Sequence, residues 1–266
     1  GSLLNAKGVG ARLLEQLKLP ITAAKKEKKE RIRRRIDRRT PRKVLSRILR
    51  SPKSFKNGFV MEDTEVVLPL TKERYPIVDG IIDFVGDSVS SRSLSKTIME
   101  SPFYSQFYEG VFRPGLTRLV TSRSISKDIA LSLELLEPES EWAVLDVACG
   151  TGNYTRAIAE KLDPGLGLAV GLDMSWPMLF RAGQKQESIG FNNLFFVRGD
   201  ALDLPFKDAS LNAVHCAGAF HLFSHPEQVL REFGRVLKPQ GRIVLGTFLK
   251  SKISALRFIQ QHGSPL

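Results

Sequence analysis

A strand-to-helix turn at residues 143–155 constrains the fold more than any other feature of this chain. An apolar run ends at the carboxylate of Asp146, and the Gly150-Thr151-Gly152 segment then opens a helical pattern. Glycine is required where the backbone takes a positive φ or lets a ligand approach closely. The free N–H groups at the start of the following helix favour an anionic group such as a carboxylate. The turn therefore predicts a ligand site at the end of this strand.

Three further apolar runs follow at spacings typical of alternating strands and helices. LAVGLD ends at Asp173, 21 residues after Gly152, FFVRGD ends at Asp200, and LNAVHCAGAFH leads into the amphipathic pattern EQVLREFGRVLKP. A carboxylate about twenty residues after the turn is placed to accept both hydroxyls of a ribose. The loop DVACGTG lacks the G-x-G-x-x-G spacing, so a dinucleotide pyrophosphate is not the expected ligand. The alternation predicts a parallel sheet with helices on both faces, with strands at 143–147, 168–172, 194–198, 211–217 and 242–248.

Together these blocks identify a resemblance to a known family. The residues that carry it are VLDVACGTGNYT, VGLDMSWPML, VRGDALDLPFKDASLNAVHCAGAFHLF and LREFGRVLKPQGRIVLGTF, within residues 144–248. The chain resembles class I S-adenosylmethionine-dependent methyltransferases of the ubiquinone/menaquinone-biosynthesis-like branch (methyltransferase type 11). The resemblance implies a Rossmann-like α/β domain, S-adenosyl-L-methionine as the cofactor and enzymatic methyl transfer.

The resemblance also implies a role for each position that matches the family's motifs. The expected cofactor positions are Asp146, Ala148, Gly150 and Gly152 at the methionine end, Asp173 at the ribose hydroxyls, Met174 against the adenine, Asp200 at the adenine amino group with Ala201 and Leu202 beside the ring, and Cys216 and Ala217 as backbone contacts near the cofactor's amino group. The alternative for the apolar members is core packing. For the three acids it is helix capping or exposure to solvent.

The chemistry of methyl transfer asks for one further candidate. Transfer from a sulfonium is an in-line displacement, so the enzyme mainly holds the nucleophile against the methyl carbon and removes water. A general base is needed only where the acceptor is not already nucleophilic. His221, just beyond the fourth strand, is the catalytic candidate for orienting or deprotonating an acceptor hydroxyl; its alternative role is to cap the loop. No N/D-P-P-Y block follows that strand, which counts against methylation of exocyclic amines on nucleic-acid bases.

The positive charge of the chain is concentrated before the methyltransferase-like blocks. Residues 25–56 hold sixteen Lys or Arg and three acids, a net charge of +13, whereas the whole chain carries +12. We therefore predict that residues 1–57 form a basic arm with short amphipathic helices. Such helices suit an anionic membrane surface, RNA or an acidic partner, and a solvated arm is an equal alternative. One of these helices has an apolar face made of Val44, Leu45, Ile48 and Leu49.

Three more regions follow the arm. Residues 58–92 are predicted to be a small β module of two or three strands, with a turn at Asp79-Gly80. Its segment RYPIVDGIIDFV resembles the end of a zinc-ribbon-like module that precedes some methyltransferase domains. No Cys or His occurs before Cys149, so we predict a metal-free module. Residues 93–136 are predicted to be a helical cap with an aromatic stripe, and residues 137–266 the cofactor-binding domain.

Cysteine usage and the last residues bear on environment and assembly. Cys149 and Cys216 fall in the cofactor blocks, where a disulfide would obstruct the site. We therefore expect reduced thiols in a reducing compartment, the cytoplasm or an organelle interior such as a plastid or mitochondrial matrix, and no secretion.

Only eighteen residues follow the fifth strand. The family's C-terminal strands are thus expected to be missing, and the exposed edge predicts an oligomer or a larger assembly.

These observations predict an enzyme that methylates a small, hydrophobic, quinone- or lipid-like acceptor, with the basic arm making it a peripheral membrane protein. Two alternatives are open. A ribosomal RNA methyltransferase would use the arm to bind RNA, although the near-neutral catalytic domain and the absent zinc ligands weaken this reading. A non-catalytic methyltransferase-like subunit of a larger assembly would explain the short C-terminus, but a scaffold has no chemical need for the cofactor acids.

Overall fold

The computed structural model describes residues 41–86 and 124–247 of the chain. Predictions that fall on residues 1–40, 87–123 and 248–266, including most of the basic arm and the aromatic stripe, lie outside the described residues. The described helices are α2 (Pro41–Ile48), α6 (Ile125–Leu136), α7 (Asn153–Lys161), α8 (Trp176–Ile189), the short 3-10 helix η3 (Phe220–Leu222) and α9 (Pro226–Val236). The described strands are β1 (Val60–Met61), β2 (Glu65–Leu68), β3 (Glu73–Val78), β4 (Ile81–Asp83), β5 (Ala143–Val147), β6 (Leu168–Asp173), β7 (Leu194–Arg198), β8 (Leu211–Ala217) and β9 (Leu237–Gly246).

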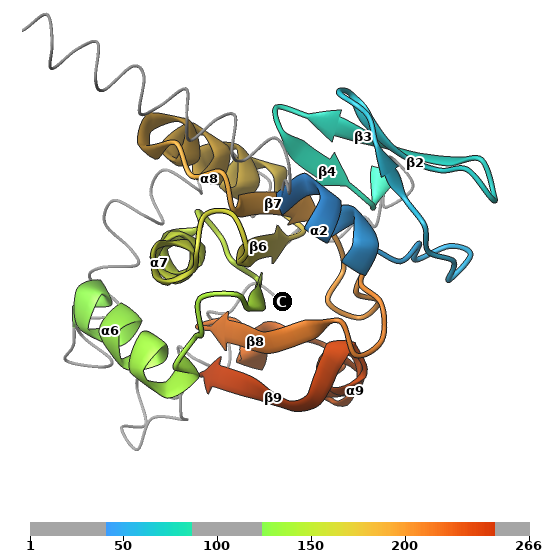
Figure 1. Cartoon of the computed structure of the whole chain (residues 1–266). Coiled ribbons are helices and arrows are strands. Elements are labelled where there is room, and N and C mark those ends of the chain that lie inside the picture. The colour runs from blue at the N-terminus through green and yellow to red at the C-terminus, as the bar shows by residue number, and fades with distance from the viewer. Residues whose placement is uncertain (1–40, 87–123, 248–266) are drawn as a thin grey trace, which may run out of the picture. The chain divides into compact units, whose positions relative to one another are not determined.

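These strands form one nine-stranded sheet in the order β1-β2-β3-β4-β7-β6-β5-β8-β9 (Figure 1). Along the sheet, the pairs in the order β4-β7-β6-β5-β8-β9 are all parallel. The pairs in the order β1-β2-β3-β4 are all antiparallel. β5 is buried along its whole length. Its residues alternate between faces, since Val144 packs into one hydrophobic cluster and Leu145 into the other. The positions of β5, β6, β7 and β8 agree with the predicted strands to within one residue.

Helices cover both faces of the parallel part of the sheet. On one face, Leu136 of α6, Ile158 of α7 and Leu179 of α8 join the same buried cluster. On the other face, Leu45 of α2 and Phe233 of α9 pack against the opposite set of strand residues. Each helix thus buries one apolar stripe against the sheet. The predicted α/β fold, a Rossmann-like parallel sheet between helices, is confirmed.

The predicted β module continues the main sheet. The turn between β3 and β4 falls at the predicted Asp79-Gly80, where both residues take a positive φ (48° and 77°), as a tight hairpin turn requires. β4 then pairs in parallel with β7, which places Ile82 opposite Val197. The module therefore shares a hydrogen-bonded sheet and a core with the parallel strands. Within residues 41–86 and 124–247, no three His, Cys, Asp or Glu side chains are grouped to hold a metal ion.

Helix α2 packs into the same core, which corrects one expectation for the arm. Leu45 and Leu49 are fully buried, and the compact unit of the chain begins at Pro41 rather than after residue 57. Ser51 is also buried, with its hydroxyl oxygen 2.9 Å from that of Tyr75 on β3. Because packing in the core already removes the side chains of Leu45 and Leu49 from water, they are not available to insert into a lipid surface. None of the described helices is long and apolar enough to cross a membrane.

The last described strand differs most from its prediction. A strand was expected at 242–248, but β9 begins at Leu237, directly after α9, and ends at Gly246. Its pairing with β8 contains a register shift between Leu211 and Ala213, and Gln240 takes a φ of 65° within it. The amphipathic pattern EQVLREFGRVLKP predicts that Leu237, Lys238 and Pro239 continue the helix, whereas the structure places them at the start of β9. Among the described strands, β9 pairs with β8 alone.

Candidate cofactor site

The ends of four parallel strands bring the predicted cofactor residues to one edge of the sheet. The order β7-β6-β5-β8 places Asp200 after β7, Asp173 at the end of β6, the 148–152 loop after β5 and Ala217 at the end of β8. In open α/β sheets, ligands bind in the crevice outside these carboxyl ends. Residues from four separate sequence blocks therefore border one candidate site.

The loop after β5 contains three residues with positive φ: Ala148 (53°), Gly150 (56°) and Gly152 (74°). A Cβ atom on Gly152 would lie 2.6 Å from Cζ of Phe196, so the packing beneath the loop requires glycine there. A Cβ atom on Gly150 would meet no atom within 4 Å, so this glycine borders open space that a ligand can approach. The left-handed backbone of Ala148 is unusual for a residue that has a Cβ, and it stores strain at the site.

Asp173 joins two of these strand ends. Its Oδ2 accepts a hydrogen bond from the Gly150 backbone N–H (2.8 Å), and its Oδ1 accepts one from the Ser175 N–H (2.9 Å). Burial raises the pKa of Asp173, while the hydrogen bonds from Ser175 and Gly150 oppose that rise by stabilising the charged form. A carboxylate offers about four lone-pair positions. Each oxygen therefore retains the capacity to accept a ribose hydroxyl.

Asp146 lies in a buried polar cluster with Thr155 and His215. The Thr155 hydroxyl donates to Oδ2 of Asp146 (2.5 Å), and Nδ1 of His215 lies 2.7 Å from Oδ1. Because an ionised carboxylate only accepts, this arrangement assigns the proton to Nδ1. The other ring nitrogen, Nε2, is buried and has no hydrogen-bond partner within the part of the chain that the structure describes. Buried polar atoms are rarely left unpaired, so Nε2 fits a polar group of a bound ligand.

His215 is the residue that sequence reasoning missed. It occurs inside the apolar run LNAVHCAGAFH, two positions before β8 ends. A histidine within a buried strand, beside the strand that carries Asp146, was the available signal. The Tyr154 ring also packs on the imidazole, with 4.8 Å between the ring centroids. Asp146 therefore orients protein side chains, and its predicted contact with the methionine end of the cofactor stays a prediction.

The expected adenine residues lie on the loops that follow β6 and β7. Oδ1 of Asp200 accepts a hydrogen bond from the Leu202 N–H (2.9 Å), and Ala201 between them is buried. The Met174 carbonyl accepts a hydrogen bond from Nε of Arg198 (3.1 Å). Both loops are thus held in defined conformations beside Asp173. Their contacts with the adenine ring remain predictions.

Of the remaining candidates, Cys149 follows β5, Cys216 lies near the end of β8, and His221 lies beyond β8. Cys149 and Cys216 are buried and unpaired. Burial raises the pKa of both thiols, that of Cys216 to about 12, so neither is a thiolate nucleophile at neutral pH. His221 lies in η3, beyond β8, with Nδ1 at 3.5 Å from the hydroxyl of Thr247. Partial desolvation lowers the pKa of His221, which favours a neutral imidazole that can accept a proton.

Part of the chain is similar in sequence to known methyltransferases. Residues 144–241 match the family model described as a methyltransferase domain. Relatives include the demethylmenaquinone methyltransferase of Lactiplantibacillus plantarum, 41% identical over 103 residues, which are 38% of this chain and 43% of that protein. The enzyme of the same name from Listeria welshimeri is 37% identical over 114 residues, or 42% and 47%. Among solved structures, the YcgJ protein of Bacillus subtilis has 28% identity and a TM-score of 0.47, covering 52% of this chain and 57% of that chain.

Residues 144–241 are therefore a methyltransferase domain of the class I, S-adenosylmethionine-dependent type. This confirms what the motifs predict. The chain spans less than half the length of the two demethylmenaquinone methyltransferases. The site residues fit the cofactor chemically, since carboxylates accept its ribose hydroxyls, and the unpaired Nε2 of His215 suits its charged amino-acid end.

Proposed function

We propose that this chain transfers the methyl group of S-adenosylmethionine to a small, hydrophobic acceptor of the quinone class. The observation that carries the proposal is the position of Asp173 at the end of β6. Its carboxylate accepts a hydrogen bond from the glycine loop that follows β5, and it keeps lone pairs for a ribose. The match of residues 144–241 to a methyltransferase domain supports the reaction. The acceptor class is supported by the names of the relatives at 37% and 41% identity.

The protein's part in this reaction is to bind, orient and exclude water. S-adenosylmethionine, when bound, supplies a methyl group on a positively charged sulfur. Asp173 would hold the ribose, Asp200 the adenine amino group, and the 148–152 loop the amino-acid end. His221 would orient or deprotonate an acceptor hydroxyl, because its lowered pKa keeps the imidazole neutral near physiological pH. The protein would accelerate transfer mainly by holding the acceptor atom in line with the methyl group.

We also propose that the enzyme works near an anionic membrane surface in a reducing compartment. A quinone-like acceptor partitions into lipid, and the +13 charge of residues 25–56 would attract the protein to anionic headgroups. Since the apolar face of α2 is buried in the core, this attraction would rest on charge and would weaken with salt. The two unpaired, buried thiols are compatible with a reducing environment.

A labelling experiment tests the acceptor. The protein is incubated with methyl-labelled S-adenosylmethionine and, separately, with a demethylated quinone, anionic lipid extract or total RNA. We expect label in the quinone, and we expect His221→Asn to lower kcat without changing cofactor affinity. Label in RNA alone would overturn the quinone proposal in favour of an RNA methyltransferase. Cofactor binding without transfer to any substrate would favour the non-catalytic subunit.

A further inference from the structure

A buried ion pair connects the β module to the cofactor site. Asp83, the last residue of β4, lies opposite Arg198 of β7, and the guanidinium Nη1 is 3.3 Å from Oδ2 of Asp83. Both side chains are less than a tenth exposed. The same guanidinium donates through Nε to the Met174 carbonyl (3.1 Å) and lies 5.1 Å from the centroid of the Trp176 ring. Arg198 therefore links Asp83 to the residues that directly follow Asp173.

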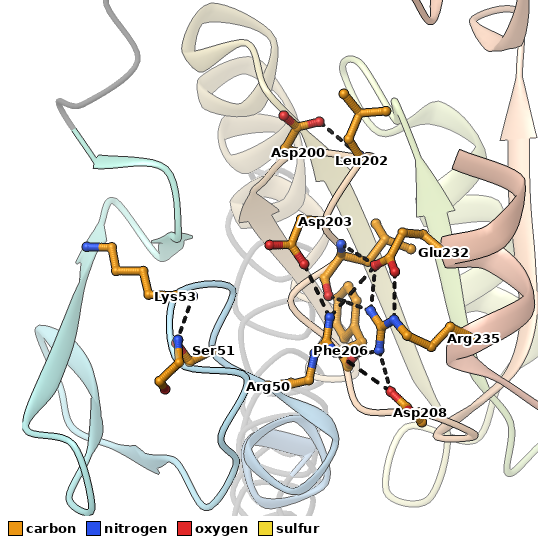
Figure 2. A network of polar contacts seen from close by, with 12 residues as sticks. Arg50, Ser51, Lys53, Asp200, Leu202, Asp203, Phe206, Asp208, Glu232 and Arg235 are labelled. Carbon is orange, nitrogen blue, oxygen red and sulfur yellow. Dashed lines mark hydrogen bonds and ion pairs between the residues drawn. The ribbon is translucent and has the colours of Figure 1, made fainter. Parts of the chain in front are cut away.

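A second contact joins the segment after α2 to the loop that follows β7. Leu49 forms an antiparallel bridge with Phe206, and the Arg50 N–H donates to the Pro205 carbonyl (3.1 Å). The Arg50 guanidinium also lies 3.2 Å from Oδ1 of Asp203. Figure 2 shows the Arg50 side chain pointing toward Asp203, on the loop that also carries Asp200. The loop is thus held from the segment that precedes the β module.

Helix α9 completes this second network. Oε2 of Glu232 accepts a hydrogen bond from the Leu204 N–H (2.8 Å) and lies 3.9 Å from the Arg50 guanidinium. Arg235 donates to the Phe206 carbonyl (2.7 Å) and pairs with Glu232 (Figure 2). Residues 203–208, directly after the expected adenine residues, contact the network at four points, which are Asp203, Leu204, Phe206 and Asp208. The network therefore stabilises the conformation of the loop that follows β7.

The two contacts hold the two loops that are expected to surround the adenosine. Removing one member of a buried ion pair leaves the other charge unpaired, so Arg198 without Asp83 would be driven to a new position. Its bond to the Met174 carbonyl would then be lost or redirected. We infer that residues 41–86 are a built-in positioning element for the adenosine half of the cofactor site, with Asp83 and Arg50 as positioning residues; this inference rests on the proposed function.

The test compares two ligands that share adenosine. The dissociation constants of S-adenosylmethionine and of 5′-methylthioadenosine, which lacks the amino-acid end, are measured by calorimetry for the parent, Asp83→Asn and Arg50→Lys. We expect each variant to weaken both ligands by the same factor, roughly 2- to 30-fold, while kcat at saturating cofactor is retained. Glu65→Gln is the control, because it breaks the exposed ion pair between Glu65 and Arg74 of the same module. It should change neither constant.

Each outcome decides between the inference and its alternatives. A lowered Tm with unchanged dissociation constants in both variants would show that the contacts are structural only and would overturn the inference. Loss of affinity for S-adenosylmethionine but not for 5′-methylthioadenosine would also overturn it, because the effect would then lie at the amino-acid end. If Asp83→Asn does not fold, Arg50→Lys decides, since its partner Asp203 is partly exposed. A parent that binds neither ligand would overturn the proposed function together with this inference.

Discussion

The ends of β5 and β6 carry two aspartates in similar sequence contexts, yet the structure gives them different surroundings. Asp146 is buried, and both of its oxygens are engaged by side chains, those of Thr155 and His215. Asp173 is engaged by backbone N–H groups of the two loops beside it and remains partly exposed. The comparison separates two tasks. The first aspartate binds buried side chains beneath the site, whereas the second joins two loops and keeps lone pairs where we expect the ribose.

The largest expected effect is on stability, at the β5 end. Asp146→Ala would leave the buried donors of Thr155 and His215 without an acceptor, so we expect a loss of about 3 kcal/mol in the free energy of unfolding. His215→Asn, which retains an N–H donor for Asp146, should cost clearly less. Chemical denaturation measures both values. Equal stability of Asp146→Ala and the parent would show that the buried cluster does not support the fold.

The next effect is on ligand binding, at the β6 end. Asp173→Ala should weaken S-adenosylmethionine by about 2–3 kcal/mol, or roughly 30- to 150-fold, because the ribose loses a charge-assisted acceptor. Asp163→Ala is a matched control, since Asp163 precedes β6 and also accepts two backbone N–H bonds, from Gly165 (2.7 Å) and Leu166 (3.0 Å). The control should leave affinity unchanged. Parent-like affinity in Asp173→Ala would mean that the ribose is bound elsewhere.

The pH dependence of binding should reveal the same aspartate. Burial raises the pKa of Asp173, so its carboxylate takes up a proton at a higher pH than an ordinary aspartate. In the free protein, the stability contributed by the protonated form is lost as the pH rises through the raised pKa. The ribose hydroxyls need the ionised carboxylate, so cofactor affinity should be highest above this pKa. It should fall about tenfold for each pH unit below this pKa. Calorimetry over this range should show a weaker pH dependence in Asp173→Asn, and an equal one would assign the proton to another group.

The smallest effect concerns the strained residue between the two strand ends. Ala148→Gly should relieve the left-handed backbone at a φ of 53°. We expect a gain of at most about 1 kcal/mol in stability, because the added freedom of glycine in the unfolded chain offsets part of the relief. Thermal unfolding measures the change, with Ala157→Gly in the middle of α7 as a variant that should destabilise. A lower Tm for Ala148→Gly would show that the Cβ of Ala148 contributes packing that outweighs its strain.

The aspartates also show how far the sequence predicted the site. Both were placed at strand ends correctly, because an apolar run that stops at a carboxylate is a local pattern. Their partners were not predicted. His215 lies 69 residues from Asp146 in the chain and meets it only because β5 and β8 are paired in one register. Long-range register decides which side chains share a face, and no local pattern records it.

By itself the sequence determined the alternation of strands and helices, the glycine turn after β5 and the hairpin turn at Asp79-Gly80, since hydrophobic period and φ preference act over a few residues. Only the tertiary structure decided that β4 pairs with β7 and that the apolar face of α2 packs into the core. The sequence showed that this face needed to leave water, and a membrane, a partner and the protein's own core satisfy that need equally. The choice among them depends on which surface lies within reach after folding, and here the sheet supplies it.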